Sequence, residues 1–78
     1  MKSLEEFVSL FAEQFDDTDA SVFTANTRFR DLEEWSSLIA LSIIAMVDEE
    51  FDITLVGNDI KNSETIEDIF RIIESKAN

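Results

Sequence analysis

Apolar residues recur with a helical period at three places along the chain. In the first, they fall mostly on one face of a helical wheel: Leu4, Phe7, Val8, Leu10, Phe11 and Phe15. This spacing predicts a helix over about residues 4–15. Its start has a physical cause, because Ser3 and Glu6 form an S-x-x-E capping box in which each side chain accepts from the other residue's backbone N–H.

The second periodic segment predicts a helix over residues 37–52. On a helical wheel one cluster of apolar positions is expected to face the core: Ala40, Ile44, Val47 and Phe51. Between Leu38 and Val47 only Ser42 is polar, so the helix is apolar almost all round. A small bundle cannot cover every side of one helix, and we therefore expect part of this surface to face solvent or a partner.

The third segment predicts a helix that starts at Thr65, where Thr65 and Asp68 resemble a second capping box. The connection before it, residues 52–63, contains a turn signal at Gly57 and is predicted to include a short helical turn over 58–62 that buries Ile60. The chain has no Pro, one Gly and no alternating apolar stretch, which makes strands improbable.

Residues 16–36 show no sustained period, so they need apolar anchors if they belong to a small folded domain. Five side chains are candidates for this role: Val22, Phe23, Phe29, Leu32 and Trp35. We expect an ordered loop packed over the helices. The predicted fold is therefore a single all-α domain over residues 1–78, a small bundle of three main helices and one short helix, with a long ordered loop between the first two helices.

Charge and composition narrow the function. Acidic residues number 18 against 6 basic ones, a net charge of −12, which argues against nucleic-acid binding and favours partners that present Arg and Lys. The chain has no Cys and no His, the residues on which most metal sites and nucleophilic enzymes depend, so we predict no metal site, no catalytic residue and no enzymatic activity. No apolar run approaches a membrane span, and we expect a cytoplasmic protein.

One segment carries a more specific signal. Ser36-Ser37-Leu38 opens the second helix, and Glu49-Glu50-Phe51-Asp52-Ile53 follows at a fixed distance. In this arrangement, which needs no gap between the two motifs, the chain resembles the acyl carrier proteins, and the likeness extends over nearly the whole chain. The resemblance implies an acyl-carrier-like fold and a covalent 4′-phosphopantetheine on Ser37, transferred from coenzyme A by a phosphopantetheinyl transferase of the holo-acyl-carrier-protein-synthase type.

The resemblance also implies the function: a stand-alone, monomeric carrier that holds acyl intermediates as thioesters and delivers them to acyl-transferring or acyl-modifying enzymes, in a specialised pathway. One departure from the family is Ser36, which stands where an Asp is usual. Ser and Asp are about equally good N-caps, so capping is preserved. Ser36 is nevertheless a rival attachment site, and Ser37 is preferred because it keeps the spacing to Leu38 and Phe51.

The same resemblance places the partner surface on the second helix. Apolar contact is expected from Leu38, Ile39 and Met46, and ion pairing with basic patches from Asp48, Glu49 and Glu50. The helical wheel suggests a pocket that shelters an acyl chain, formed by Leu41, Ile44, Ile60 and Ile66. Two alternatives remain open at this point: an unmodified acidic helical interaction module, and an aminoacyl or peptidyl carrier.

The charge imbalance generates a first prediction. Self-repulsion among 18 acidic side chains should lower stability at low ionic strength, so added NaCl or MgCl2 should raise the melting temperature. Circular dichroism melts over a salt series measure this directly. A melting temperature that ignores both salts would contradict the expectation.

Overall fold

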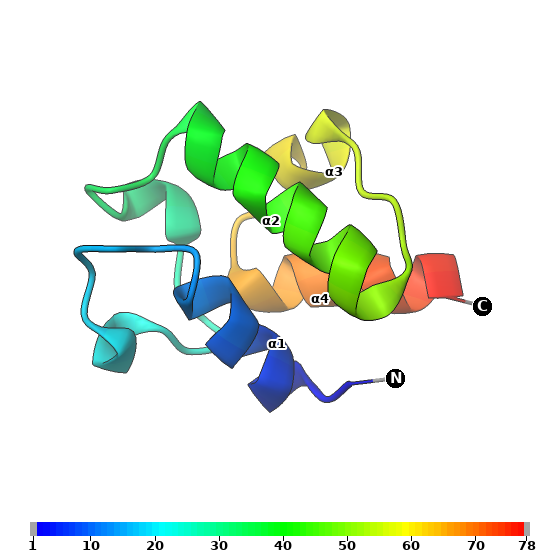
Figure 1. Ribbon diagram of the computed structural model, residues 1–78, viewed down its shortest axis with the longest axis horizontal. Coiled ribbons are helices and arrows are strands. Elements are labelled where there is room, and N and C mark those ends of the chain that lie inside the picture. Colours follow the sequence, from blue (N-terminus) through cyan, green and yellow to red (C-terminus); the bar gives the residue numbers. More distant parts are fainter. Residues whose placement is uncertain (1, 78) are drawn as a thin grey trace.

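Four α-helices form the framework of the computed structural model, which describes residues 2–77 (Figure 1). They are α1 (Leu4–Ala12), α2 (Ser37–Phe51), α3 (Gly57–Lys61) and α4 (Ile66–Ala77). Within the described range there is no strand, and a single isolated bridge pairs Arg28 with Thr65. The predicted all-α bundle of three main helices and one short helix is confirmed.

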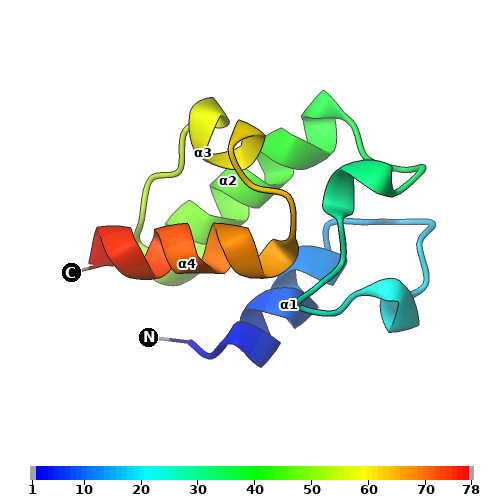
Figure 2. The ribbon, with the colours of Figure 1, turned by 180° about the vertical axis from the view of Figure 1, so that it is seen from behind.

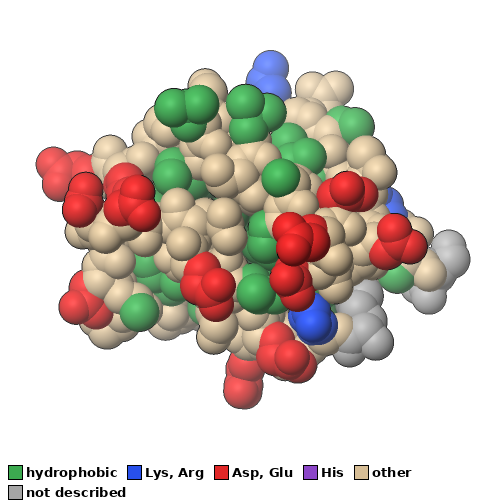
Figure 3. All heavy atoms as spheres, viewed as in Figure 1, with side chains coloured by type: hydrophobic (Ala, Val, Ile, Leu, Met, Phe, Trp, Pro, Cys, Tyr) green, Lys and Arg blue, Asp and Glu red, His purple; other side chains and the backbone are tan. Residues whose placement is uncertain are grey.

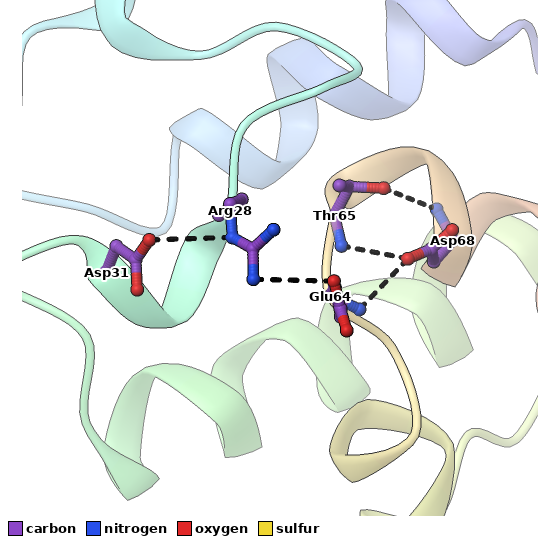
Figure 4. A network of polar contacts seen from close by, with 5 residues as sticks. All are labelled: Arg28, Asp31, Glu64, Thr65 and Asp68. Carbon is purple, nitrogen blue, oxygen red and sulfur yellow. Dashed lines mark hydrogen bonds and ion pairs between the residues drawn. The ribbon is translucent and has the colours of Figure 1, made fainter.

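Both predicted capping boxes are present. At α1 the Ser3 hydroxyl accepts from the Glu6 N–H at 3.2 Å, and the Glu6 carboxylate accepts from the Ser3 N–H at 3.2 Å. At α4 the Thr65 hydroxyl accepts from the Asp68 N–H at 3.2 Å, and Asp68 accepts from the Thr65 N–H at 3.0 Å (Figure 4). Each box satisfies backbone donors that a helix start leaves without partners.

Helix α1 ends at Ala12, three residues before the predicted end. Beyond it the backbone forms 3₁₀-type hydrogen bonds between residues three positions apart. The Gln14 N–H donates to the Phe11 carbonyl and the Phe15 N–H to the Ala12 carbonyl, both at 3.1 Å. Phe15 still reaches the core through this tighter turn. The periodic spacing of apolar residues therefore extends beyond the last residue of the helix, which is why the predicted end was too late.

The long connection between α1 and α2 is ordered, as predicted, and contains two short 3₁₀ turns, η1 (Ala20–Val22) and η2 (Phe29–Asp31). Phe23 and Phe29 are buried, and Leu32 and Trp35 pack against the core. Val22 is 45% exposed, so its predicted role as an anchor is wrong. It ends η1, a turn of three residues that contains no buried side chain.

This connection is also tied to the start of α4. The Ile66 N–H donates to the Thr27 carbonyl at 3.2 Å, and the Glu67 N–H donates to the Ala25 carbonyl at 2.9 Å. Figure 4 shows Arg28 between two carboxylates at the same junction, 3.6 Å from Asp31 and 3.4 Å from Glu64. Backbone hydrogen bonds and aromatic packing, more than these exposed ion pairs, hold the loop.

The core lies where α1, α2 and α4 meet, with α4 crossing in front of α2 when the molecule is seen from behind (Figure 2). Phe7 is fully buried and makes ring contacts with Phe11, Phe51 and Phe70 at 5.7–5.9 Å between centroids. Aromatic pairs at such separations add about 0.5–1.5 kcal/mol each beyond area burial.

The buried face of α2 matches the predicted one in part, because Val47 is buried and Phe51 packs against the core, as predicted. Its buried residues are Ile43, Met46 and Val47, whereas Ala40 and Ile44 are only partly buried. Because the helix is apolar on nearly all sides, the helical wheel does not single out one face. Tertiary packing makes the choice, and one flank of α2 is left open toward α3.

Helix α2 ends at Phe51, followed by Asp52 in the left-handed region with a φ of 56°. Asp52 is exposed, and its side chain forms no hydrogen bond or ion pair with other residues in the described part of the chain. It occupies a backbone position that glycine adopts without steric cost.

We therefore predict that Asp52→Gly raises the free energy of unfolding by up to about 1 kcal/mol, because it relieves the left-handed strain at the end of α2. Asp52→Ala is the matched control and should lower stability, since alanine tolerates positive φ less well than aspartate. Urea unfolding of the three proteins measures the effect. An alanine variant at least as stable as the glycine variant would contradict it.

Candidate functional site

Two adjacent serines at the start of α2 have different roles. Ser36 is the N-cap, and its hydroxyl accepts from the Ile39 N–H at 3.3 Å. Ser37 is the first residue of the helix and is exposed, and its hydroxyl has no hydrogen-bond partner in the described part of the chain. The cap is therefore made by Ser36, and the Ser37 hydroxyl forms no hydrogen bond within the described fold.

The segment before these serines is held by Glu34. Its carboxylate accepts three hydrogen bonds from the chain that follows α1: from the Asp16 N–H at 2.7 Å, the Asp17 N–H at 3.0 Å and the Thr18 hydroxyl at 2.7 Å. The hydrogen bond from Thr18, together with those from the backbone N–H groups, lowers the pKa of Glu34 below its ordinary value. One ionised side chain thus joins two parts of the long loop.

Trp35 holds the same segment from the apolar side. Its ring lies parallel to that of Phe11, with an interplanar angle of 3° and 6.4 Å between centroids, and is tilted against Phe29 at 4.8 Å. Trp35 is partly buried, as expected of a packing anchor for the loop. Trp35 directly precedes Ser36, so this packing holds the backbone next to the start of α2.

A groove of about 740 Å³ opens beside Ser37, between α2, α3 and the end of the long loop. Its lining is mainly apolar and includes both serines: Arg30, Trp35, Ser36, Ser37, Ala40, Leu41, Ile44, Gly57, Ile60 and Lys61. Its volume lies within the range of about 300–1,000 Å³ that is typical of small-molecule sites. An apolar chain attached near Ser37 would find this groove next to its point of attachment.

The groove brings together three of the four residues predicted to form an acyl pocket. Leu41, Ile44 and Ile60 line it, whereas Ile66 is fully buried in the core and does not reach it. Ile66 is the first residue of α4, which packs on α1. Its place in the apolar stripe of that helix therefore indicates a core position and not a pocket position. Sequence reasoning missed Ala40, assigned to the core, and also the two basic residues of the lining, Arg30 and Lys61.

Arg30 and Lys61 gave no usable signal in the sequence. Arg30 reaches the groove because the 3₁₀ turn η2 directs it toward α3, where Nη1 donates to the Ile60 carbonyl at 3.0 Å. Its guanidinium carbon also lies 5.1 Å from the centre of the Phe29 ring. Arg30 and Lys61 are 31 positions apart in the sequence, and only the fold brings them to one site.

Several residues of the predicted partner surface on α2 are exposed. Leu38 and Leu41 are 75% and 61% exposed, and Asp48, Glu49 and Glu50 are exposed toward the end of the helix. Figure 3 shows apolar side chains near the start of α2 and acidic ones over its later half.

One of the predicted partner contacts is wrong. Met46 is 6% exposed and belongs to the core, so it cannot offer apolar contact to a partner. Ile39 is half-buried and packs against the core. Leu41, one turn after Leu38 on the open side of the helix, was predicted for the pocket alone and is also a surface residue.

Across residues 2–77, no helix is long and apolar enough to cross a membrane, and no cluster of three or more acidic side chains is arranged to hold a metal ion. Comparison with known proteins finds no family model, no curated protein and no solved structure that matches this chain. Function is therefore inferred from the site itself.

The Glu34 clamp predicts a pH dependence. A pKa that is lowered in the folded state contributes stability that is present above the ordinary carboxyl value of 4.5 and is lost as the pH falls through the folded pKa. Glu34→Gln, which cannot ionise, should therefore be less stable than the parent chain at pH 7, and the difference should shrink as the pH falls below about 4.5.

Urea unfolding of both proteins at several pH values tests this. Glu33→Gln, an exposed neighbour with the same change of charge, is the matched control and should leave stability nearly unchanged at pH 7. A Glu34→Gln deficit that stays constant down to pH 3 would show that the carboxylate charge does not support the clamp.

Proposed function

We propose that this protein is a carrier in which Ser37 holds 4′-phosphopantetheine and the arm tethers acyl groups as thioesters. One observation supports it above the others: Ser36 makes the helix cap, so the Ser37 hydroxyl remains exposed and unengaged at the edge of a largely apolar groove. An attachment point and a shelter for an apolar chain thus lie side by side. The resemblance of the sequence to acyl carrier proteins points to the same serine.

The residues around Ser37 suit the phosphodiester of such an arm. The backbone N–H groups of Ser37 and Leu38 have no hydrogen-bond partner in the described part of the chain, and both point out of the start of a 15-residue helix. The positive end of the helix dipole favours an anion there by about 0.3–1 kcal/mol. No carboxylate among the described residues lines the groove to oppose it.

In the modification, a phosphoester bond forms to the Ser37 oxygen, the hydroxyl proton leaves, and the nucleotide part of coenzyme A departs. The chain has no His, and no carboxylate of residues 2–77 lines the groove, so the phosphopantetheinyl transferase is expected to supply the base. The bound group supplies a thiol that holds acyl cargo. The chain itself positions that group and catalyses no step. In this proposal the chain, the transferase and coenzyme A are all in the cytoplasm.

Partner enzymes would dock on α2. Leu38 and Leu41 offer exposed apolar contact beside Ser37, and Asp48 and Glu49 offer carboxylates two to three turns further along. A partner patch with an apolar centre and flanking Arg or Lys matches this arrangement. The acidic excess of the chain would also speed its encounter with basic partners.

A mass measurement tests the proposal. After incubation with coenzyme A and a broad-specificity phosphopantetheinyl transferase, the parent chain should gain the mass of one arm, and Ser37→Ala should gain none. Ser36→Ala is the matched control: it should still be modified, although loss of the cap lowers its stability by about 0.5–2 kcal/mol.

The contrary outcomes are distinct. An unmodified parent chain would favour an acidic interaction module that uses Leu38 and Leu41 without an arm. Modification that persists in Ser37→Ala and disappears in Ser36→Ala would move the attachment site by one residue. An aminoacyl or peptidyl carrier would be modified in the same way, and the cargo released from the isolated protein would identify it.

A further inference from the structure

The six basic residues of the chain fall into two groups. Four of them pair with carboxylates at 2.7–3.6 Å: Lys2, Arg28, Arg71 and Lys76. The other two, Arg30 and Lys61, form no ion pair with any carboxylate among residues 2–77, and both line the groove beside Ser37. In a chain with three acidic residues for every basic one, unpaired cations are the exception.

The charged side chains that line the groove are both basic. Its ten lining residues include two cations and two serines, and the rest are apolar residues and one glycine. Although the chain carries 18 acidic residues, none within the described part lines this groove. Arg30 and Lys61 are therefore the charged side chains that a ligand in the groove would contact.

Arg30 is held in position for an anion. One of its N–H groups donates to the Ile60 carbonyl at 3.0 Å, and its guanidinium lies over the Phe29 ring at 5.1 Å. A guanidinium has five N–H donors, which leaves most of them for a ligand. Lys61, next to Ile60 at the end of α3, adds three further donors without a partner in the described chain.

We propose that the groove binds a chain-like ligand that ends in a carboxylate. The apolar body lies along the lining from Trp35 to Ile60, and the carboxylate is held by Arg30 and Lys61. For the carrier this names the cargo class: an acyl group derived from a dicarboxylic acid, with one carboxyl in the thioester and the other free. That identification rests on the proposed function, but binding itself is testable on the unmodified chain.

Trp35 provides the readout, because it is the single Trp of the chain and lines the groove. Its fluorescence is titrated at about 0.15 M salt with three probes of matched length: monomethyl decanedioate, dimethyl decanedioate and decyltrimethylammonium. We expect the monoanion to bind at least about tenfold more tightly than the neutral diester or the cation, since charge-assisted hydrogen bonds contribute at that scale.

The double variant Arg30→Gln/Lys61→Gln should lose that tenfold advantage for the monoanion and keep the affinity for the diester. Gln at position 30 is shorter than Arg, so the hydrogen bond to the Ile60 carbonyl can be lost, and melting curves check that the fold survives. Arg71→Gln/Lys76→Gln, two ion-paired cations on α4, is the control with the same change of charge and should bind like the parent chain.

Equal affinities for the three probes, an unaltered double variant, or Trp35 fluorescence that no probe changes would overturn the inference. So would a concentration-dependent dimer, seen by sedimentation, that buries Trp35 without a ligand. A chain that prefers the monoanion but never accepts the arm overturns the proposed function alone. A chain that accepts the arm but binds all probes alike overturns this inference alone.

Discussion

The candidate site depends on how the long loop is fastened immediately before α2. Glu34 accepts three hydrogen bonds from the chain after α1, and Trp35 stacks on aromatic side chains of the core. These two neighbours combine a charge-assisted clamp with apolar packing, and the next two residues are the serines of the site. If either fastening were lost, the conformational freedom regained by the loop would reach the start of α2 directly.

Patterning predicted the helices well because each has a local cause. The caps at Ser3 and Thr65 can be identified from three or four residues, and both are present in the structure. The order of the loop also followed from its apolar residues, of which Phe23 and Phe29 are buried. The prediction for Val22 was wrong because successive side chains in a 3₁₀ turn point in different directions, and the sequence did not predict this turn.

The open flank of α2 was harder to predict. A helix that is apolar on nearly every side has no dominant face, so Met46 was predicted on the surface and Ala40 in the core. In the structure Met46 is buried, and Ala40 is only partly buried and lines the groove. The two basic residues of the groove could not be predicted from the sequence, for a different reason. Arg30 and Lys61 matter because they remain unpaired, and pairing is decided by which distant carboxylates the fold brings near each cation.

The division of roles between the two serines has a thermodynamic consequence. Since the α2 cap is made by Ser36, a substituent added to the Ser37 oxygen removes no hydrogen bond from the described fold. The decorated and undecorated chains would then present the same helical surface, including Leu38 and the acidic end of α2. A protein that recognises only that surface would bind the modified and the unmodified chain equally well. To prefer the modified chain, it would have to contact the added group itself.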